Sequence, residues 1–334
     1  MGLLTLEVLL ILGTANHVLK LPKPLLIVSG AFFLTSTAIV WFVGRRAKWH
    51  PAAMIASTFF TWLPVTLFFL WWLYHWDRAG WLWSTISGYD ATLAEDFSGA
   101  VDLPAKEFVR KNSIFKIDSE DSSKLILPSG EYQIDQTIVV PRGISLMISP
   151  GVTMRFGVGC SLISYGPIIA KGTENTPIVF TAQNKWRKWG VVGVVSRDSS
   201  VFDYTIFEHG RQALVNGVEF TGCLSLRDSV VHITNCRFMN LYGKDAVSVR
   251  RSKVLIRNNT FENTSNDGLD LDGGAGEVSR NRFVNCGDES IDLSGNDDLR
   301  VFDNQIIDAR GGRIAADKNL EQIKSQNTLK RLKI

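Results

Sequence analysis

The chain has 334 residues, 45% of them hydrophobic, and a formal net charge of +3 at pH 7. This small charge, without a basic stripe interleaved with aromatic residues, argues against a nucleic-acid partner. The averages conceal two unlike parts, because eight of the ten tryptophans lie between Trp41 and Trp83 and most charged residues follow residue 100.

Residues 1–83 are predicted to form a membrane domain. Residues 25–43 and 52–74 contain no charged side chain, and about 20 helical residues cross a hydrocarbon core. Both stretches are therefore predicted transmembrane helices. The basic loop 45–50 between them belongs in the cytoplasm by the positive-inside rule. We accordingly expect an integral protein of the inner (cytoplasmic) membrane, with everything after about residue 77 periplasmic or extracellular.

Residues 3–19 are apolar but short, and they include Glu7, Asn16 and His17. One interpretation is a third span whose Glu7 faces another integral membrane subunit, because an intramembrane carboxylate is costly unless it is sheltered. The other is a helix that lies along the membrane surface. Two or three N-terminal helices are thus expected, and residues 1–83 are the expected contact surface for membrane partners.

Residues 84–122 are mixed and charged and contain no repeat, which predicts a linker with a possible short helix at 105–110. In the following region, 123–319, the part nearest the C-terminal end repeats at a spacing of 22–23 residues. Four phrases repeat: Cys236-Arg237-Phe238, Asn259-Thr260-Phe261, Asn281-Arg282-Phe283 and Asn304-Gln305-Ile306. A period of this length indicates a unit that buries its apolar face by stacking on its neighbours.

Apolar pairs return inside each unit with a polar residue between them: Val247/Val249, Leu269/Leu271 and Ile291/Leu293. This period of two is typical of strands. We therefore predict an all-β parallel solenoid of seven to nine coils. Phe238, Phe261, Phe283 and Ile306 should form one buried column, Asn259, Asn281 and Asn304 an internal hydrogen-bonded stack, and Cys236 a buried thiol at the Asn position.

These repeats, with Leu127–Tyr132, Ile148–Val152 and Ile169–Ala182 before them, resemble the right-handed parallel β-helix proteins of the pectin-lyase-like superfamily. The resemblance covers about residues 124–319 and implies the fold. It does not decide the function, because this fold hosts lyases, hydrolases, epimerases and proteins without catalytic activity.

Residues 320–334 are predicted to be either a cap on the open end of the solenoid or a basic tail. The four cysteines, at positions 160, 223, 236 and 286, fall outside the cytoplasm on the expected topology. An oxidising compartment permits disulfides, but their number alone determines no pairing.

Acidic residues recur at equivalent positions of successive coils. Asp245, Asp267 and Glu289 share one position, and Asp270 and Asp292 share the outward position between two inward apolar residues. Adjacent coils lie about 4.8 Å apart, where two carboxylates repel by roughly 3 kcal/mol at an effective dielectric constant near 20. A bound cation, a retained proton with a raised pKa, or outward splay into water must offset this repulsion.

The phrase Asn266-Asp267-Gly268, followed by Asp288-Glu289 on the next coil, resembles the polygalacturonase-type glycoside hydrolases. That resemblance implies catalytic roles for Asp267, Asp288 and Glu289 as general acid and water-activating base. The histidine and the Arg-x-Lys of those enzymes have no counterpart here. A Ca²⁺ site formed by Asp267, Asp270, Glu289 and Asp292 is a second interpretation, and ordinary solvated turn residues are a third.

These features together predict a membrane-anchored, extracytoplasmic β-helix subunit of an envelope assembly that makes, exports or modifies an extracellular polymer. Its role would be that of a scaffold or polymer-contacting accessory. The alternative function is a membrane-tethered carbohydrate-active enzyme that uses the stacked acids. The expected polymer partner is a polysaccharide or another extracellular polymer.

Overall fold

The computed structural model describes residues 41–50, 53, 57, 96–296, 298–307 and 313–330. The chain divides into two compact units, Met1–Asp90 and Ala91–Ile334. Within the described residues, no helix is both long enough and apolar enough to span a bilayer. The predicted spans 3–19, 25–43 and 52–74 lie outside those residues, apart from positions 41–43, 53 and 57, so the anchor stays a prediction.

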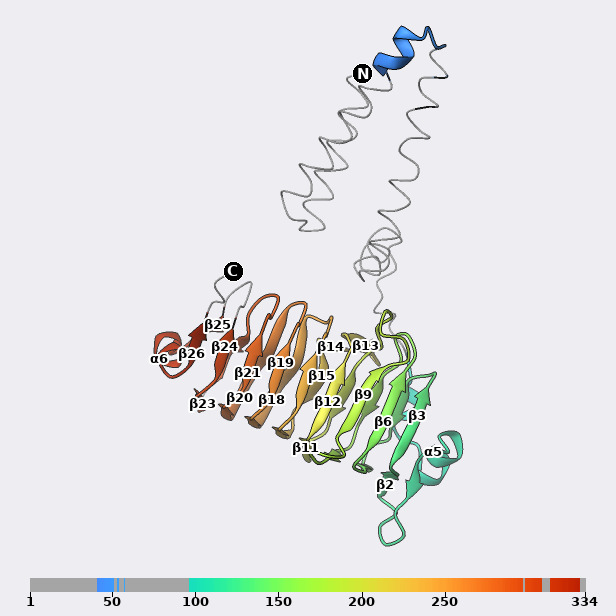
Figure 1. The fold of residues 1–334 in the computed structure, drawn as a ribbon. Coiled ribbons are helices and arrows are strands. Elements are labelled where there is room, and N and C mark those ends of the chain that lie inside the picture. Colours follow the sequence, from blue (N-terminus) through green and yellow to red (C-terminus); the bar gives the residue numbers. More distant parts are fainter. Residues whose placement is uncertain are drawn as a thin grey trace. The chain divides into compact units, whose positions relative to one another are not determined.

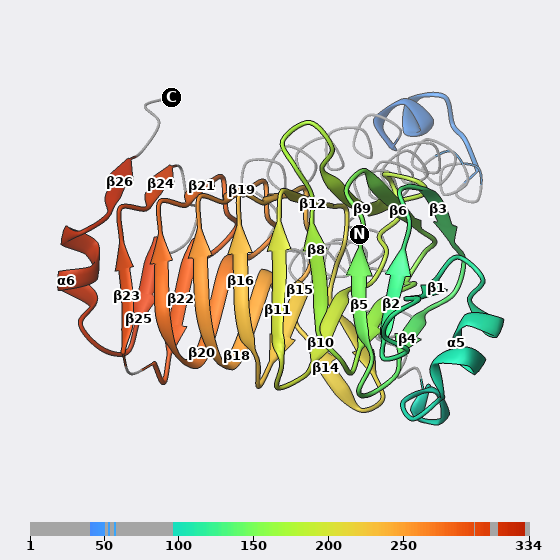
Figure 2. The same ribbon diagram turned by 90° about the horizontal axis from the view of Figure 1, so that it is seen from below.

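The second unit is a solenoid of parallel strands, which follow one another along its axis in Figures 1 and 2. One of its sheets has nine strands, one from each successive coil. They are β3 (Gly130–Ile134), β6 (Val152–Phe156), β9 (Ile178–Ala182), β12 (Thr205–Glu208), β17 (Arg237–Met239), β19 (Thr260–Glu262), β21 (Arg282–Val284), β24 (Gln305–Ile307) and β26 (Thr328–Lys330). The predicted all-β solenoid is therefore confirmed, at about nine coils.

The second sheet has fifteen strands and forms the remaining walls, because two of its strands continue around a corner of the coil. β18 (Asp245–Arg257) pairs with β15 through its first half and with β16 through its second half, and β20 (Asp267–Ser279) follows β18 along its length. The other strands are β1 (Lys116–Ile117), β2 (Lys124–Leu127), β4 (Ile138–Val140), β5 (Ser145–Ile148), β7 (Leu162–Ser164), β8 (Ile168–Lys171), β10 (Val192–Val195), β11 (Ser199–Asp203), β15 (Gly222–Arg227), β16 (Val230–Thr234), β22 (Ile291–Ser294), β23 (Leu299–Phe302) and β25 (Ile314–Ala316).

The predicted aromatic column is present, and the 22–23-residue register is correct. Phe238 pairs with Phe261, Phe261 with Phe283, and Phe283 with Ile306. The ring centroids of Phe238, Phe261 and Phe283 lie 4.8 and 4.5 Å apart, in near-parallel planes. The stack extends back through Phe207 to Phe180 at 5.0 Å per step. Aromatic stacking therefore runs through the core of five consecutive coils.

The asparagine stack is also present and is longer than the repeat phrases indicated. Each asparagine Oδ1 accepts the backbone N–H of the equivalent residue one coil earlier, at 2.8–2.9 Å, in the series Cys236, Asn259, Asn281, Asn304 and Asn327. Each Nδ2 donates to a backbone carbonyl of the preceding coil, such as that of Ile256 for Asn281. The ladder thus satisfies buried amides that no strand partner reaches.

Both ends of the solenoid are covered. At the N-terminal end, α5 (Ala105–Lys111) buries Phe108 against Phe115, with ring centroids 5.3 Å apart. The predicted linker 84–122 therefore contains a folded cap, which is preceded by the short helix η1 (Ser98–Ala100). At the other end, α6 (Leu320–Ser325) packs Leu320 and Ile323 against the core. The described residues 320–330 thus pack on the last coil, where β26 also pairs with β24.

Candidate acidic site

The acidic residues lie where the chain passes from the nine-stranded sheet into the other sheet. Residues 263–266 connect β19 to β20, and residues 285–290 make the same connection one coil later. Both connections begin with an asparagine in the left-handed region, Asn263 at φ 56° and Asn285 at φ 54°, a conformation that asparagine tolerates. The Asn285 Nδ2 donates to Asn263 Oδ1 at 2.7 Å. The two turns therefore stack directly.

Gly287 makes this close stacking possible. Its N–H donates to the Asn266 carbonyl at 3.0 Å. A Cβ at this position would lie 2.0 Å from the Ser265 carbonyl oxygen. Any residue other than glycine would therefore clash with the backbone of the preceding turn. The glycine therefore lets Asp288 and Glu289 approach the Asp267 turn.

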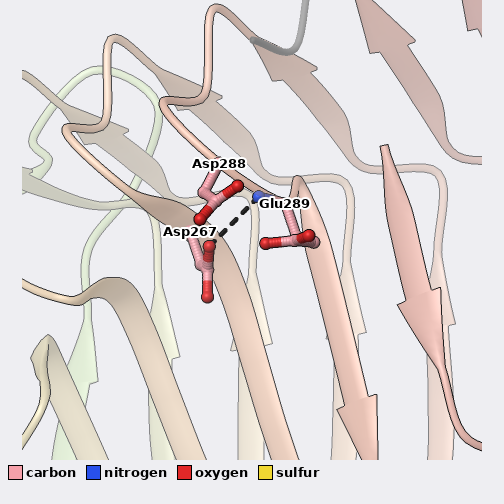
Figure 3. A group of neighbouring side chains, drawn as sticks. All are labelled: Asp267, Asp288 and Glu289. Carbon is pink, nitrogen blue, oxygen red and sulfur yellow. Dashed lines mark hydrogen bonds between the residues drawn. The ribbon is translucent and has the colours of Figure 1, made fainter. Parts of the chain in front are cut away.

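Figure 3 shows how the three side chains converge. Carboxylate oxygens of Asp267, Asp288 and Glu289 all lie within 4.8 Å of one another. The backbone N–H of Glu289 donates to Asp267 Oδ1 at 3.1 Å. Asp267 is only 9% exposed, whereas Asp288 and Glu289 are partly buried. The structure thus brings together all three predicted catalytic candidates.

The predicted Ca²⁺ ligands do not form one group. Asp267 and Glu289 belong to the convergent cluster, whose third member is Asp288. Asp270 and Asp292 pair with each other further along β20 and β22, on the outward column that continues from Ser248. The three-carboxylate cluster and the Asp270–Asp292 pair are distinct because Asp288 and Glu289 lie in the turn before β22, whereas Asp292 lies within β22.

Burial and mutual repulsion raise the pKa values of several carboxyl groups in these coils. Burial is the largest cause for Asp267, whose pKa rises to about 8 with further contributions from Asp245 and Glu289. Burial, then Asp245 and Asp292, raise the pKa of Asp270 to about 7. Burial also raises the pKa of Asp245, which is 5% exposed and directly adjacent to Asp267 in register. A retained proton therefore relieves much of the repulsion that stacking imposes.

The two cations whose charges act on Asp245, Arg250 and Lys244, each lie near another carboxylate. Arg250 Nε lies 3.9 Å from the Asp272 carboxylate, and Lys244 Nζ lies 2.8 Å from Glu219. Chemically, the cluster offers a protonated carboxyl beside two others, which is the composition of an acid–base pair. It also offers three hard oxygen ligands, to which Ca²⁺ would add waters to complete its usual six to eight.

The spacing of the carboxylates bears on the hydrolase interpretation. Inverting glycosidases keep their two carboxyl groups roughly 6.5–9.5 Å apart so that a water fits between them, whereas retaining enzymes keep them roughly 5–5.5 Å apart. In the cluster, one oxygen of each of the three carboxylates lies within 4.8 Å of one oxygen of the other two, so the three groups are close enough to contact one bound substrate or ion.

Other residues that the sequence singled out are structural. The four cysteines are buried thiols that form no disulfide, and burial raises the pKa of the Cys236 thiol to about 12. Sequence reasoning missed the depth of Asp245 and the ladder role of Asn327. The 23-residue step from Asn304 to Asn327 was the available signal for Asn327.

Comparison of the whole chain with curated proteins and with solved structures finds no match. Residues 168–329 match the protein-family model described as "Right handed beta helix region". That stretch includes β8 through Leu329 of β26 and contains the acidic cluster. With the stacked parallel strands of both sheets, this match shows that the chain is a right-handed parallel β-helix protein.

Proposed function

We propose that this protein is a membrane-anchored β-helix subunit of an envelope assembly that makes, exports or modifies an extracellular polymer, in which it serves as a scaffold or polymer-contacting accessory. The observation that carries the proposal is a solenoid with a helix over each end, α5 and α6, in a chain whose residues 25–43 and 52–74 lack charged side chains. A covered solenoid has no free sheet edge through which it would polymerise. Its long outer walls remain available to partners.

The test is purification of the full chain from its native membrane in a mild detergent. A defined set of membrane partners, present in stoichiometric amounts, is the expected result. A reporter fused after residue 83 should report the extracytoplasmic side, and one placed within residues 45–50 the cytoplasmic side. A reporter after residue 83 that reads as cytoplasmic would refute the proposal, because the solenoid could then not meet an extracellular polymer.

A second candidate function is cleavage of a polysaccharide at the acidic cluster. The specific observation in its favour is that Asp267, with a pKa of about 8, lies within 4.8 Å of Asp288 and Glu289. A carboxyl that keeps its proton at neutral pH can act as a general acid while an ionised neighbour acts as a base or nucleophile. The cluster has the composition that such chemistry requires.

The two functions separate in one assay. If the cluster is catalytic, Asp267→Asn and Asp288→Asn should each abolish release of reducing sugar from a panel of polysaccharides with the fold intact. Asp272→Asn is the matched control, because Asp272 is an exposed acid of the same strand β20 that lies outside the cluster. Absence of any release by the wild-type protein would leave only the scaffold function.

A further inference from the structure

One connection in the solenoid is longer than the others and forms a structure of its own. Residues 240–244, 263–266 and 285–290 carry the chain directly from the nine-stranded sheet into the next strand. Between β12 and β15 the same connection spans residues 209–221. It contains an antiparallel hairpin of β13 (Ala213–Val215) and β14 (Val218–Phe220). The coil itself does not require this insertion, because the shorter connections close equivalent coils.

The hairpin packs on the outer face of the second sheet, where it builds a small core separate from the solenoid axis. Phe220 is fully buried in this cluster with Ile163 of β7. A Cβ on Gly193 of β10 would lie 2.7 Å from Phe220 Cε1 and 3.0 Å from Ile163 Cδ1. Gly193 therefore provides the flat place on the strand that the ring occupies.

The same small core includes Phe97 and Ala100, which belong to the segment 97–101 through which the chain enters the β-helix. Phe97 and Ala100 are only partly buried. Their packing partners lie on the hairpin and on the outward positions of β4, β7 and β10, such as Val139. The hairpin thus covers the entering segment from the side that the solenoid wall leaves open.

A single side chain at the hairpin tip, Asn216, connects the entering segment to the solenoid wall. Asn216 Oδ1 accepts the backbone N–H of Phe97 at 2.5 Å, and Asn216 Nδ2 donates to the Tyr165 hydroxyl at 2.9 Å. Asn216 and Gly217 have φ values of 51° and 73°, as a two-residue Asn-Gly hairpin turn requires. The asparagine therefore serves both the turn and the contact.

We propose that the β13–β14 hairpin is a clasp that fixes segment 97–101 to the flank of the solenoid and so sets the place where the chain enters the β-helix. The Val101 carbonyl, which accepts the Arg142 N–H at 2.8 Å, marks the point at which the segment joins the solenoid wall. Residues before that point depend on the clasp for their order.

The test is hydrogen exchange, followed by mass spectrometry, on the full chain in detergent. Asn216→Gly keeps the positive φ that the turn needs and removes both side-chain hydrogen bonds. Gly193→Ala leaves those bonds in place and displaces the Phe220 ring. Asn240→Gly is the matched control, because Asn240 has a similar φ of 55° at the start of an ordinary connection.

Loss of two hydrogen bonds should accelerate exchange in residues 97–101 by about tenfold or more, with exchange in β19 and β21 unchanged. Gly193→Ala should act in the same direction, and Asn240→Gly should leave residues 97–101 unaffected. Unchanged exchange in both clasp variants would overturn the proposal. Acceleration throughout the solenoid would overturn it as well, because the hairpin would then be an integral part of the main folding unit.

Discussion

Replacing Phe261 by alanine removes a ring from the middle of the aromatic column. Phe261 is fully buried, and its ring lies between Phe238 at 4.8 Å and Phe283 at 4.5 Å. Truncation of a buried phenylalanine to alanine costs about 3–5 kcal/mol, since transfer free energy is lost and a cavity remains. Two stacking contacts are lost as well, and such pairs are worth about 0.5–1.5 kcal/mol each beyond their buried area. We therefore expect a loss near the upper end of the range.

Urea unfolding followed by circular dichroism measures this loss. Glu262→Ala, in the same short strand but on its outward side, is the matched control and should change the unfolding free energy by less than about 0.5 kcal/mol. A solenoid can lose two-state behaviour when one coil is weakened, so a broader transition in Phe261→Ala is also expected. A loss below about 1 kcal/mol would refute the argument that the column carries the stability of these coils.

Three further predictions follow from the ladder and the acidic coils. Asn281→Leu should lower the free energy of urea unfolding by about 2 kcal/mol or more, because it leaves the buried Asn259 N–H and the Ile256 carbonyl without their partner. An unchanged free energy would mean that the ladder is dispensable. In the folded state the pKa of Asp267 is raised to about 8. Between about pH 4 and 8 the folded protein therefore holds a proton on Asp267 that the unfolded chain has released. The free energy of unfolding should fall as pH rises through this window, by up to about 1.4 kcal/mol per pH unit. The same titration on Asp267→Asn should show a shallower slope, and an unchanged slope would assign the dependence to other groups. If the cluster holds Ca²⁺, millimolar Ca²⁺ should raise the melting temperature by mass action and Asp288→Asn should remove that gain, whereas a gain that survives in this variant would place the ion elsewhere.

The repeat made the fold predictable from the sequence. In a parallel solenoid the same position recurs once per coil, so the spacing of Phe238, Phe261 and Phe283 was enough to predict their stacking. The Asn ladder followed for the same reason. Alternation of apolar and polar residues in Leu269-Asp270-Leu271 similarly predicted which side chains face inward. These properties depend on local periodicity, which neighbouring coils reinforce.

The acidic cluster was only partly predictable. Equivalent positions placed Asp267 beside Glu289, but the choice between Asp288 and Asp270 as the third partner depends on how the turn at Gly287 stacks on the turn before it. The burial of Asp267, which with the adjacent Asp245 raises the pKa of Asp267 to about 8, also required the structure. Periodicity assigns a residue to a column and does not specify the path of an irregular turn.

The two caps and the hairpin were decided by tertiary structure. Residues 98–111, 213–220 and 320–325 carry no repeat, and their elements are short, so their local sequence contains little information about where they pack. Phe108, Phe220 and Ile323 find their places because the solenoid presents an uncovered apolar surface at each end and on one flank. The sequence by itself determined the repeated coils. In them each side chain packs on the equivalent side chain of the neighbouring coil, so the periodic pattern also specifies the packing contacts. Where the chain leaves the repeated coils, only the assembled solenoid supplies the surface against which it folds.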